Sequence, residues 1–145
     1  MFSQTQTACP ARGTTYSQML ERVRYDGAYP TRERAERVVR AVLGALGRQL
    51  PVTEREALAA CLPEEAGLIL RDQVTVAEPL TGWGFVKDLA AEMGGTPATT
   101  RWDTGAVLAV VSNLAGDQLM AQVLDELPPG YALLFGRAEL TQRAA

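Results

Sequence analysis

Histidine, the side chain that most often acts as general base or metal ligand, does not occur in this sequence of 145 residues. A Ser–His or Cys–His nucleophile therefore cannot form, and neither a glycine-rich phosphate loop nor a pair of CxxC motifs is present. The acidic pairs Glu64-Glu65 and Asp125-Glu126 each fall at an expected helix end, and Glu64-Glu65 is placed to stabilise the positive end of a helix. We expect no enzymatic activity, no cofactor and no metal, and we assign no catalytic, cofactor-binding or metal-binding residue.

The two cysteines are the remaining reactive side chains. Cys9 lies in a polar leader, whereas Cys61 lies inside an apolar helical pattern, and their placement has no metal-ligand spacing. We expect Cys61 to pack in the core as a small apolar side chain, with a reactive thiol as the alternative. A chain of this length can bury roughly 70% of the surface its unfolded form exposes, so neither a metal nor a disulfide staple is required for folding.

Charge and composition favour a soluble globular protein. The net charge is −3, with 47% apolar and 21% charged residues, and only one lysine, Lys87, occurs. Residues 1–72 hold 10 arginines against 9 acids, whereas residues 73–145 hold 4 basic against 8 acidic residues. No apolar stretch approaches the roughly 20 residues that cross a bilayer, and the start MFSQTQTACPARG is unlike a secretory signal. We therefore expect a cytoplasmic location without membrane contact.

The elements that position these side chains are all expected to be helices. The clearest signal spans 31–50, where apolar residues from Ala35 to Leu50 recur at offsets of 3, 4, 7, 8, 11 and 15. Capping boxes are expected at Thr53 with Glu56 and at Thr100 with Asp103. Further expected helices span 15–25, 53–62, 64–71, 85–93, the stretch after Thr100, 119–127 and a final turn around 131–135.

The pattern repeats at a spacing of 65 residues, since Ala41-Val42-Leu43 falls on Ala106-Val107-Leu108 and Leu62-Pro63 on Leu127-Pro128. We expect two pseudo-symmetric units of about four helices each, packed into one all-α bundle. The predicted organisation is a flexible leader over 1–14, a single helical domain over 15–137 and a tail over 138–145. Within the domain, repeat one is 15–72, an irregular connector is 73–83, and repeat two is 84–137.

Four segments carry a family resemblance: Arg34-Ala35 to Leu46, Leu62-Pro63-Glu64-Glu65, Phe85-Val86 and Leu127-Pro128. Together they resemble the bacterial domain-of-unknown-function family 2267 over roughly residues 16–137. The resemblance implies an all-helical fold in the bacterial cytoplasm. It implies no activity and supplies no catalytic residues.

Two hypotheses about function involve aromatic side chains. The first is a protein-interaction or self-associating helical module, suggested by amphipathic helices and by aromatic residues near loops: Tyr25, Tyr29, Trp83 and Trp102. These rings could instead complete the core, with Trp83 packed into the junction between the halves. The second is a small-molecule or lipid site between the two halves, lined by Trp83, Phe85 and Trp102.

A third hypothesis is nucleic-acid binding through arginines of the first half: Arg32, Arg34, Arg37, Arg40 and Arg48. Glu33 and Glu36 are interleaved with these arginines and cancel much of their field, and the net charge is negative. This hypothesis ranks last of the three.

Overall fold

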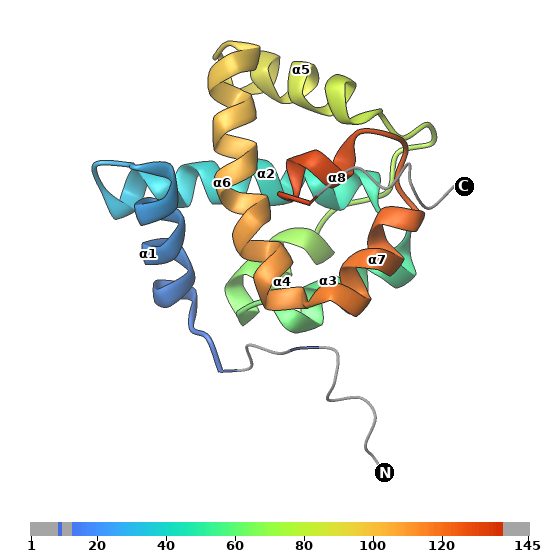
Figure 1. The fold of residues 1–145 in the computed structure, drawn as a ribbon, viewed down its shortest axis with the longest axis horizontal. Coiled ribbons are helices and arrows are strands. Elements are labelled where there is room, and N and C mark those ends of the chain that lie inside the picture. The colour runs from blue at the N-terminus through green and yellow to red at the C-terminus, as the bar shows by residue number, and fades with distance from the viewer. Residues whose placement is uncertain (1–8, 10–12, 138–145) are drawn as a thin grey trace.

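The computed structural model describes residue 9 and residues 13–137, which fold into eight α-helices with no strand among them (Figure 1). Helices account for 73% of this described part, and the predicted all-α fold is confirmed. The helices are α1 (Tyr16–Gly27), α2 (Arg32–Gln49), α3 (Val52–Cys61), α4 (Glu64–Arg71), α5 (Gly82–Met93), α6 (Pro97–Ala115), α7 (Asp117–Asp125) and α8 (Tyr131–Leu134).

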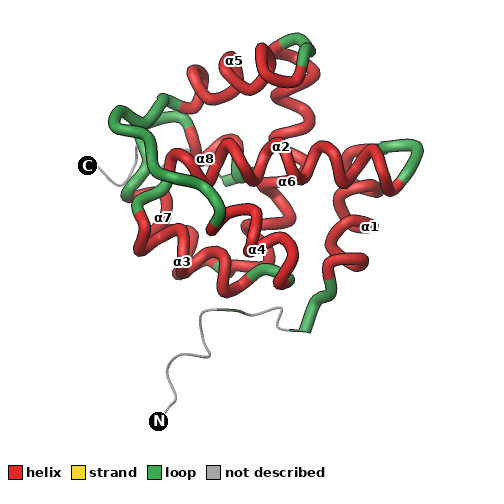
Figure 2. Tube along the Cα trace, turned by 180° about the vertical axis from the view of Figure 1, so that it is seen from behind, coloured by secondary structure: helices red, strands yellow, loops and turns green. Residues whose placement is uncertain are grey.

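The two long helices, α2 and α6, cross near the centre of the molecule, and the shorter helices surround them (Figures 1 and 2). The stripe predicted from Ala35 to Leu50 is buried along its whole length on α2. On α6, Val107, Leu108 and Val111 are fully buried against it. A single core results because the apolar faces of both long helices meet in one place.

Helix ends follow the sequence only in part. The first helix was expected to begin at residue 15, and Thr15 instead caps α1, in a reciprocal capping box with Gln18. The box predicted at Thr53 with Glu56 is wrong, because α3 begins two residues earlier, after Pro51, and has no side-chain cap. The box predicted at Thr100 is also wrong.

The cap of α6 is formed by Thr96 with Thr99, and Pro97 occupies the first helical position. A proline there loses no hydrogen bond, and its fixed φ suits a helix start. Thr100 is consequently inside the helix and 1% exposed. The true box therefore lies four residues before the predicted one.

The connector between the halves is irregular, as predicted, but it is held by buried polar groups. The guanidinium of Arg55, 7% exposed, donates to the carbonyls of Gly47 and Leu50 at the end of α2 and to Oγ1 of Thr75 in the connector. The side-chain oxygen of the buried Gln49 accepts from the backbone N–H of Leu80 at 2.7 Å. A cation at the C-terminal carbonyls of a helix also stabilises the negative end of its dipole.

The connector ends earlier than expected, because α5 begins at Gly82 and already includes Trp83. The prediction that Trp83 packs into the junction is wrong: its side chain is 62% exposed on the first turn of α5. Space at this helix start is limited by Gly130, whose backbone lies so close to Gly82 that a Cβ on Gly82 would be 2.6 Å from the Gly130 carbonyl carbon.

Helix lengths follow the same order in the two predicted units. The first four helices have 12, 18, 10 and 8 residues and the last four have 12, 19, 9 and 4. Pseudo-symmetry of the two units stays a prediction. The predicted tail over 138–145 and most of the predicted leader over 1–14 lie outside the described residues.

Within the described part, no single helix is both long and apolar enough to cross a membrane. Only α6 and α7 taken together reach the required length and composition, and they are bent by 120° at their junction.

Candidate interaction groove

A groove of about 750 Å³ lies on the surface between α1 and the C-terminal half of α6. Met19, Val110 and Leu114 are buried side chains at its base, whereas Tyr25, 81% exposed, stands at its edge. The groove opens to solvent and has a mainly apolar lining. It lies between the two predicted halves, since α1 belongs to the first and α6 to the second. The lining residues are Thr14, Ser17, Gln18, Met19, Glu21, Arg22, Tyr25, Arg32, Val110, Asn113 and Leu114.

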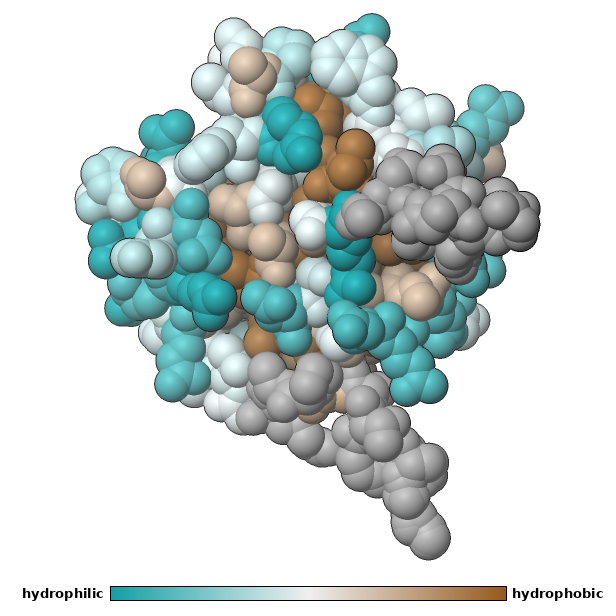
Figure 3. Space-filling model, in the orientation of Figure 1, coloured by the Kyte–Doolittle hydropathy of each residue, from teal (hydrophilic) through white to brown (hydrophobic). Residues whose placement is uncertain are grey.

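A second hollow of about 390 Å³ continues along α6. Its lining residues are sequence neighbours of the groove's lining residues on both helices: Asp26 follows Tyr25 on α1, and Ala109 precedes Val110 on α6. The two hollows cover α6 from Trp102 to Leu114, about 18 Å at 1.5 Å per residue. Apolar surface appears among hydrophilic side chains in the centre of Figure 3, the face on which α6 lies. The second hollow is lined by Asp26, Arg101, Trp102, Gly105, Ala106 and Ala109.

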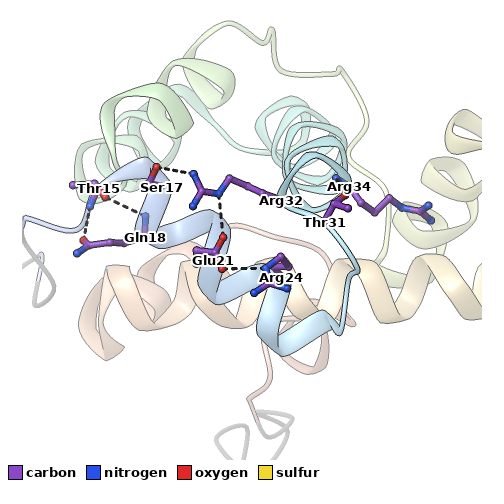
Figure 4. Close-up of polar contacts among 8 residues, drawn as sticks. All are labelled: Thr15, Ser17, Gln18, Glu21, Arg24, Thr31, Arg32 and Arg34. Atoms are coloured by element: carbon purple, nitrogen blue, oxygen red, sulfur yellow. Dashed lines mark hydrogen bonds and ion pairs between the residues drawn. The ribbon is translucent and has the colours of Figure 1, made fainter.

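One wall of the groove carries a polar network that joins α1 to α2 (Figure 4). Arg32 of α2 donates from Nε to Glu21 at 3.0 Å and from Nη1 to Ser17 at 3.3 Å. The carboxylate of Glu21 also accepts from Arg24 at 3.0 Å. These hydrogen bonds from Arg24 and Arg32 lower the pKa of Glu21 below its ordinary value. The charges along this wall are therefore already paired, and the groove itself offers a mostly apolar surface.

Two hydrogen bonds lock the α1–α2 turn onto α6. The indole N–H of Trp102 donates to the carbonyl of Gly27 at 3.0 Å, and the hydroxyl of Tyr29 donates to Asp103 at 2.5 Å. Burial of the phenol raises the pKa of Tyr29 well above its ordinary value, and the hydrogen bond to Asp103 is the second largest cause. This lock fixes the distance between α1 and α6, and therefore the width of the groove, at the end where Tyr25 lies.

The structure does not bring together the three aromatic residues predicted to line a site. Phe85 is 1% exposed and packs edge-on against Tyr131, with ring centroids 5.6 Å apart. Trp83 lies on the outside of α5, and neither ring contributes to the groove. Of the three, Trp102 alone lines a hollow of this surface, and it is 57% exposed.

The aromatic residues predicted near loops divide into two groups. Tyr29 is 8% exposed and belongs to the core, as the alternative interpretation expected. Tyr25, Trp83 and Trp102 remain largely exposed. Two of these, Tyr25 and Trp102, lie at the α1–α6 surface.

Several arginines of the proposed nucleic-acid surface are held in ion pairs. Arg40 pairs with Glu36 on α2, and Arg48 pairs with Glu92 on α5. Arg32 pairs with Glu21 in the groove wall. These contacts reduce the positive field that phosphate binding would require.

Cys9 and Cys61 form a disulfide, which sequence reasoning missed. Their Cα atoms are 5.1 Å apart, within the usual range of roughly 4.4–6.8 Å. Burial of Cys61 in the core was correctly predicted, at 8% exposure, but packing as a free thiol was wrong. The bond joins the chain before α1 to the last residue of α3, and two isolated cysteines gave no pattern from which the pairing could be read.

The described residues contain no cluster of three or more His, Cys, Asp or Glu side chains able to hold a metal ion. Glu64 and Glu65 occupy the first turn of α4, where their charges stabilise the helix N-terminus. Asp125 ends α7.

The groove combines an apolar base with a rim of paired charges, a surface suited to hydrophobic contact with another molecule.

Comparison with known proteins identifies the family. Residues 16–134 match the family of uncharacterized conserved proteins DUF2267, and the chain belongs to it. This match covers every helix of the fold but begins after Cys9. No curated protein of known function matches the chain.

Proposed function

We propose that the protein is a non-catalytic helical module that binds another polypeptide in the groove between α1 and α6. The observation that carries the proposal is a pair of adjacent hollows with mainly apolar linings, which together extend about 18 Å along α6 beside exposed Tyr25 and Trp102. Apolar patches of this kind, rimmed by polar side chains, mark interaction sites on otherwise polar protein surfaces.

The shape of the surface favours a helix as the bound element. A helix of about 12 residues has the same length as the stretch of α6 that lines the two hollows. Ala106 and Ala109 present only small side chains to the second hollow, while the larger groove beside Val110 and Leu114 accepts larger apolar side chains. Such helix-in-groove binding uses apolar anchors at positions i, i+3 or i+4, and i+7.

A small molecule or lipid in the same groove is the second candidate. The volume of about 750 Å³ lies within the roughly 300–1,000 Å³ typical of ligand sites, and the position between the halves is typical of pockets in helical bundles. The open shape of the groove favours the polypeptide, because small ligands usually bind in sites that cover most of their surface. Self-association through the same groove would make a second copy the bound polypeptide.

The test compares three tagged baits in the host lysate: wild type, Asn113→Arg and Gln118→Arg. Asn113 is exposed and lines the groove, so an arginine there blocks it, whereas Gln118 is equally exposed on α7 outside the groove. Bound proteins and extracted small molecules are both read by mass spectrometry, and light scattering on each purified bait reports self-association.

A protein captured by wild type and Gln118→Arg but lost with Asn113→Arg supports the proposal. A metabolite or lipid with the same pattern supports the second candidate instead. Identical captures by all three baits, from a wild type that is monomeric at high concentration, would refute a role for the groove.

A further inference from the structure

We propose that the Cys9–Cys61 disulfide is a reversible redox clamp that holds Cys9 at the end of α3 and thereby stabilises the N-terminal end of α1, which begins seven residues after Cys9 in the sequence. The proposal concerns the chain itself and does not depend on what occupies the groove.

The position of the bond supports this role. Cys61 ends α3, and Leu62-Pro63 leads directly into α4. The first turn of α1 lies near the start of α4, since the charge of Glu65 acts on the phenol of Tyr16. Cys9 itself packs against the core, with its sulfur 3.9 Å from the carbonyl oxygen of Ala60. The bond therefore lies where the α3–α4 corner meets the start of α1.

The fold does not need the bond as a staple. Disulfides are indispensable mainly in small domains that cannot bury a sufficient core, whereas this chain builds one continuous core from all of its longer helices. Cys9 also lies outside residues 16–134, the part that matches the family, although Cys61 lies inside it. The bond therefore joins a residue outside the family match to the core of the matched domain, which favours a role beyond folding.

Access to the two sulfurs differs, and the difference fixes the order of the reaction. Cys9 is half-buried, whereas Cys61 is 8% exposed, so the thiolate of a glutathione molecule attacks Cys9 Sγ. The Cys9–Cys61 bond breaks, Cys61 leaves as a thiolate and takes up a proton, and a mixed disulfide forms between Cys9 and glutathione. A second glutathione thiolate attacks the glutathione sulfur of this mixed disulfide, and Cys9 leaves as a thiolate and takes up a proton, so two electrons pass to the protein and the two glutathione molecules become oxidised glutathione.

Opening the clamp is expected to loosen the two segments it joins. Thr14 lines the groove and Thr15 caps α1, and they follow Cys9 by five and six residues in the sequence. Loss of the restraint allows the first turn of α1 to open more often, while the α5–α6 turn is unaffected because it lies at the opposite end of the molecule from α3 and α4 (Figure 1).

The experiment incubates the folded protein in mixtures of reduced and oxidised glutathione. Alkylation with intact mass counts the free thiols, circular dichroism checks that the helices persist, and amide hydrogen exchange follows the first turn of α1, with the α5–α6 turn as internal control. We expect two thiols to appear in the folded protein in excess reduced glutathione, with exchange at the start of α1 about tenfold faster. Cys9→Ala should show the faster exchange in every mixture.

Two results would overturn the proposal. In the first, the bond resists excess reduced glutathione and opens only when denaturant unfolds the protein, which would make it a permanent staple. In the second, the bond opens but exchange at the start of α1 stays equal to that of the oxidised protein. Exchange at the start of α1 in reduced wild type is measured without any substitution. The proposal can therefore be tested even if the Cys9→Ala variant folds poorly.

Discussion

Removing one hydroxyl, in Tyr29→Phe, is expected to destabilise the contact between the two halves by about 2 kcal/mol. The ring of Tyr29 stays buried in the variant, but Asp103 loses a charge-assisted hydrogen bond of 2.5 Å. Hydrogen bonds to charged groups contribute about 1.5–3 kcal/mol. The unfolding entropy of about 2.1 cal/mol/K per residue gives about 0.3 kcal/mol/K for 145 residues. The melting temperature should therefore fall by about 6–7 °C.

Urea denaturation of Tyr29→Phe, Asp103→Asn and the double variant measures the coupling between the two side chains directly. We expect a coupling energy of about 1 kcal/mol or more. Tyr25→Phe is the matched control, because Tyr25 is 81% exposed, and its stability should change by less than about 0.5 kcal/mol. A Tyr29→Phe variant as stable as the control, or a coupling energy near zero, would refute the lock between the halves.

The same variant carries a pH signature. The pKa of Tyr29 is raised in the folded state, so its contribution to stability is fully present below the ordinary value of 10.0 and is lost as pH rises toward the folded pKa. The stability difference between wild type and Tyr29→Phe should therefore narrow above pH 10. A difference that stays constant would contradict the burial and hydrogen bonding of this phenol.

Three further predictions concern single sites. Arg55→Met should lower the free energy of unfolding by about 2–4 kcal/mol in urea, because the buried carbonyls at the end of α2 lose their charged donor. Arg55→Lys should not restore it fully, because Nη1 donates to all three acceptors and the shorter lysine side chain places its ammonium one bond short of that position. Gly82→Ala should lower the free energy of unfolding by about 1–3 kcal/mol or more, since its Cβ meets the backbone of Gly130. Gly105→Ala meets only the end of an arginine side chain, so calorimetry should find this variant as stable as wild type or more stable. Tyr16 should titrate near pH 12 by ultraviolet absorbance, because burial and then the neighbouring carboxylate of Glu36 raise its pKa, and titration at the ordinary value would contradict the contact.

Helix positions could be predicted from the sequence because burial repeats with the helical period. The stripe on α2 and the acidic start of α4 were both located correctly. Cap positions were less predictable, since Thr96 and Thr100 are equally suitable residue types and the choice depends on Pro97 and on the face that packs against α2. Local pattern therefore predicts that a helix exists better than it predicts where the helix begins.

The candidate site was harder to predict because it depends on how helices cross. Its lining comes from α1, α2 and α6, and the polar members Ser17, Gln18 and Asn113 have no distinguishing pattern in the sequence. The hypothesis of an aromatic site included Phe85 and Trp83. Phe85 occupies a core position on α5, whereas Trp83 is exposed to solvent because α5 begins earlier than predicted. Whether a large aromatic side chain is buried or exposed therefore depends on the tertiary arrangement and cannot be read from the sequence alone.

The position of α1 connects the proposals. One end of this helix is locked to α6 through Trp102 and Gly27, and the chain before its other end is joined to α3 by the disulfide. Its middle is tied to α2 through Glu21 and Arg32, a surface pair of the kind that contributes little on its own. Since α1 forms one wall of the groove, a change at either end alters the surface offered to a partner. Groove affinity should therefore respond to Tyr29→Phe and to reduction separately, whereas Gln118→Arg, on α7, leaves both ends of α1 unchanged.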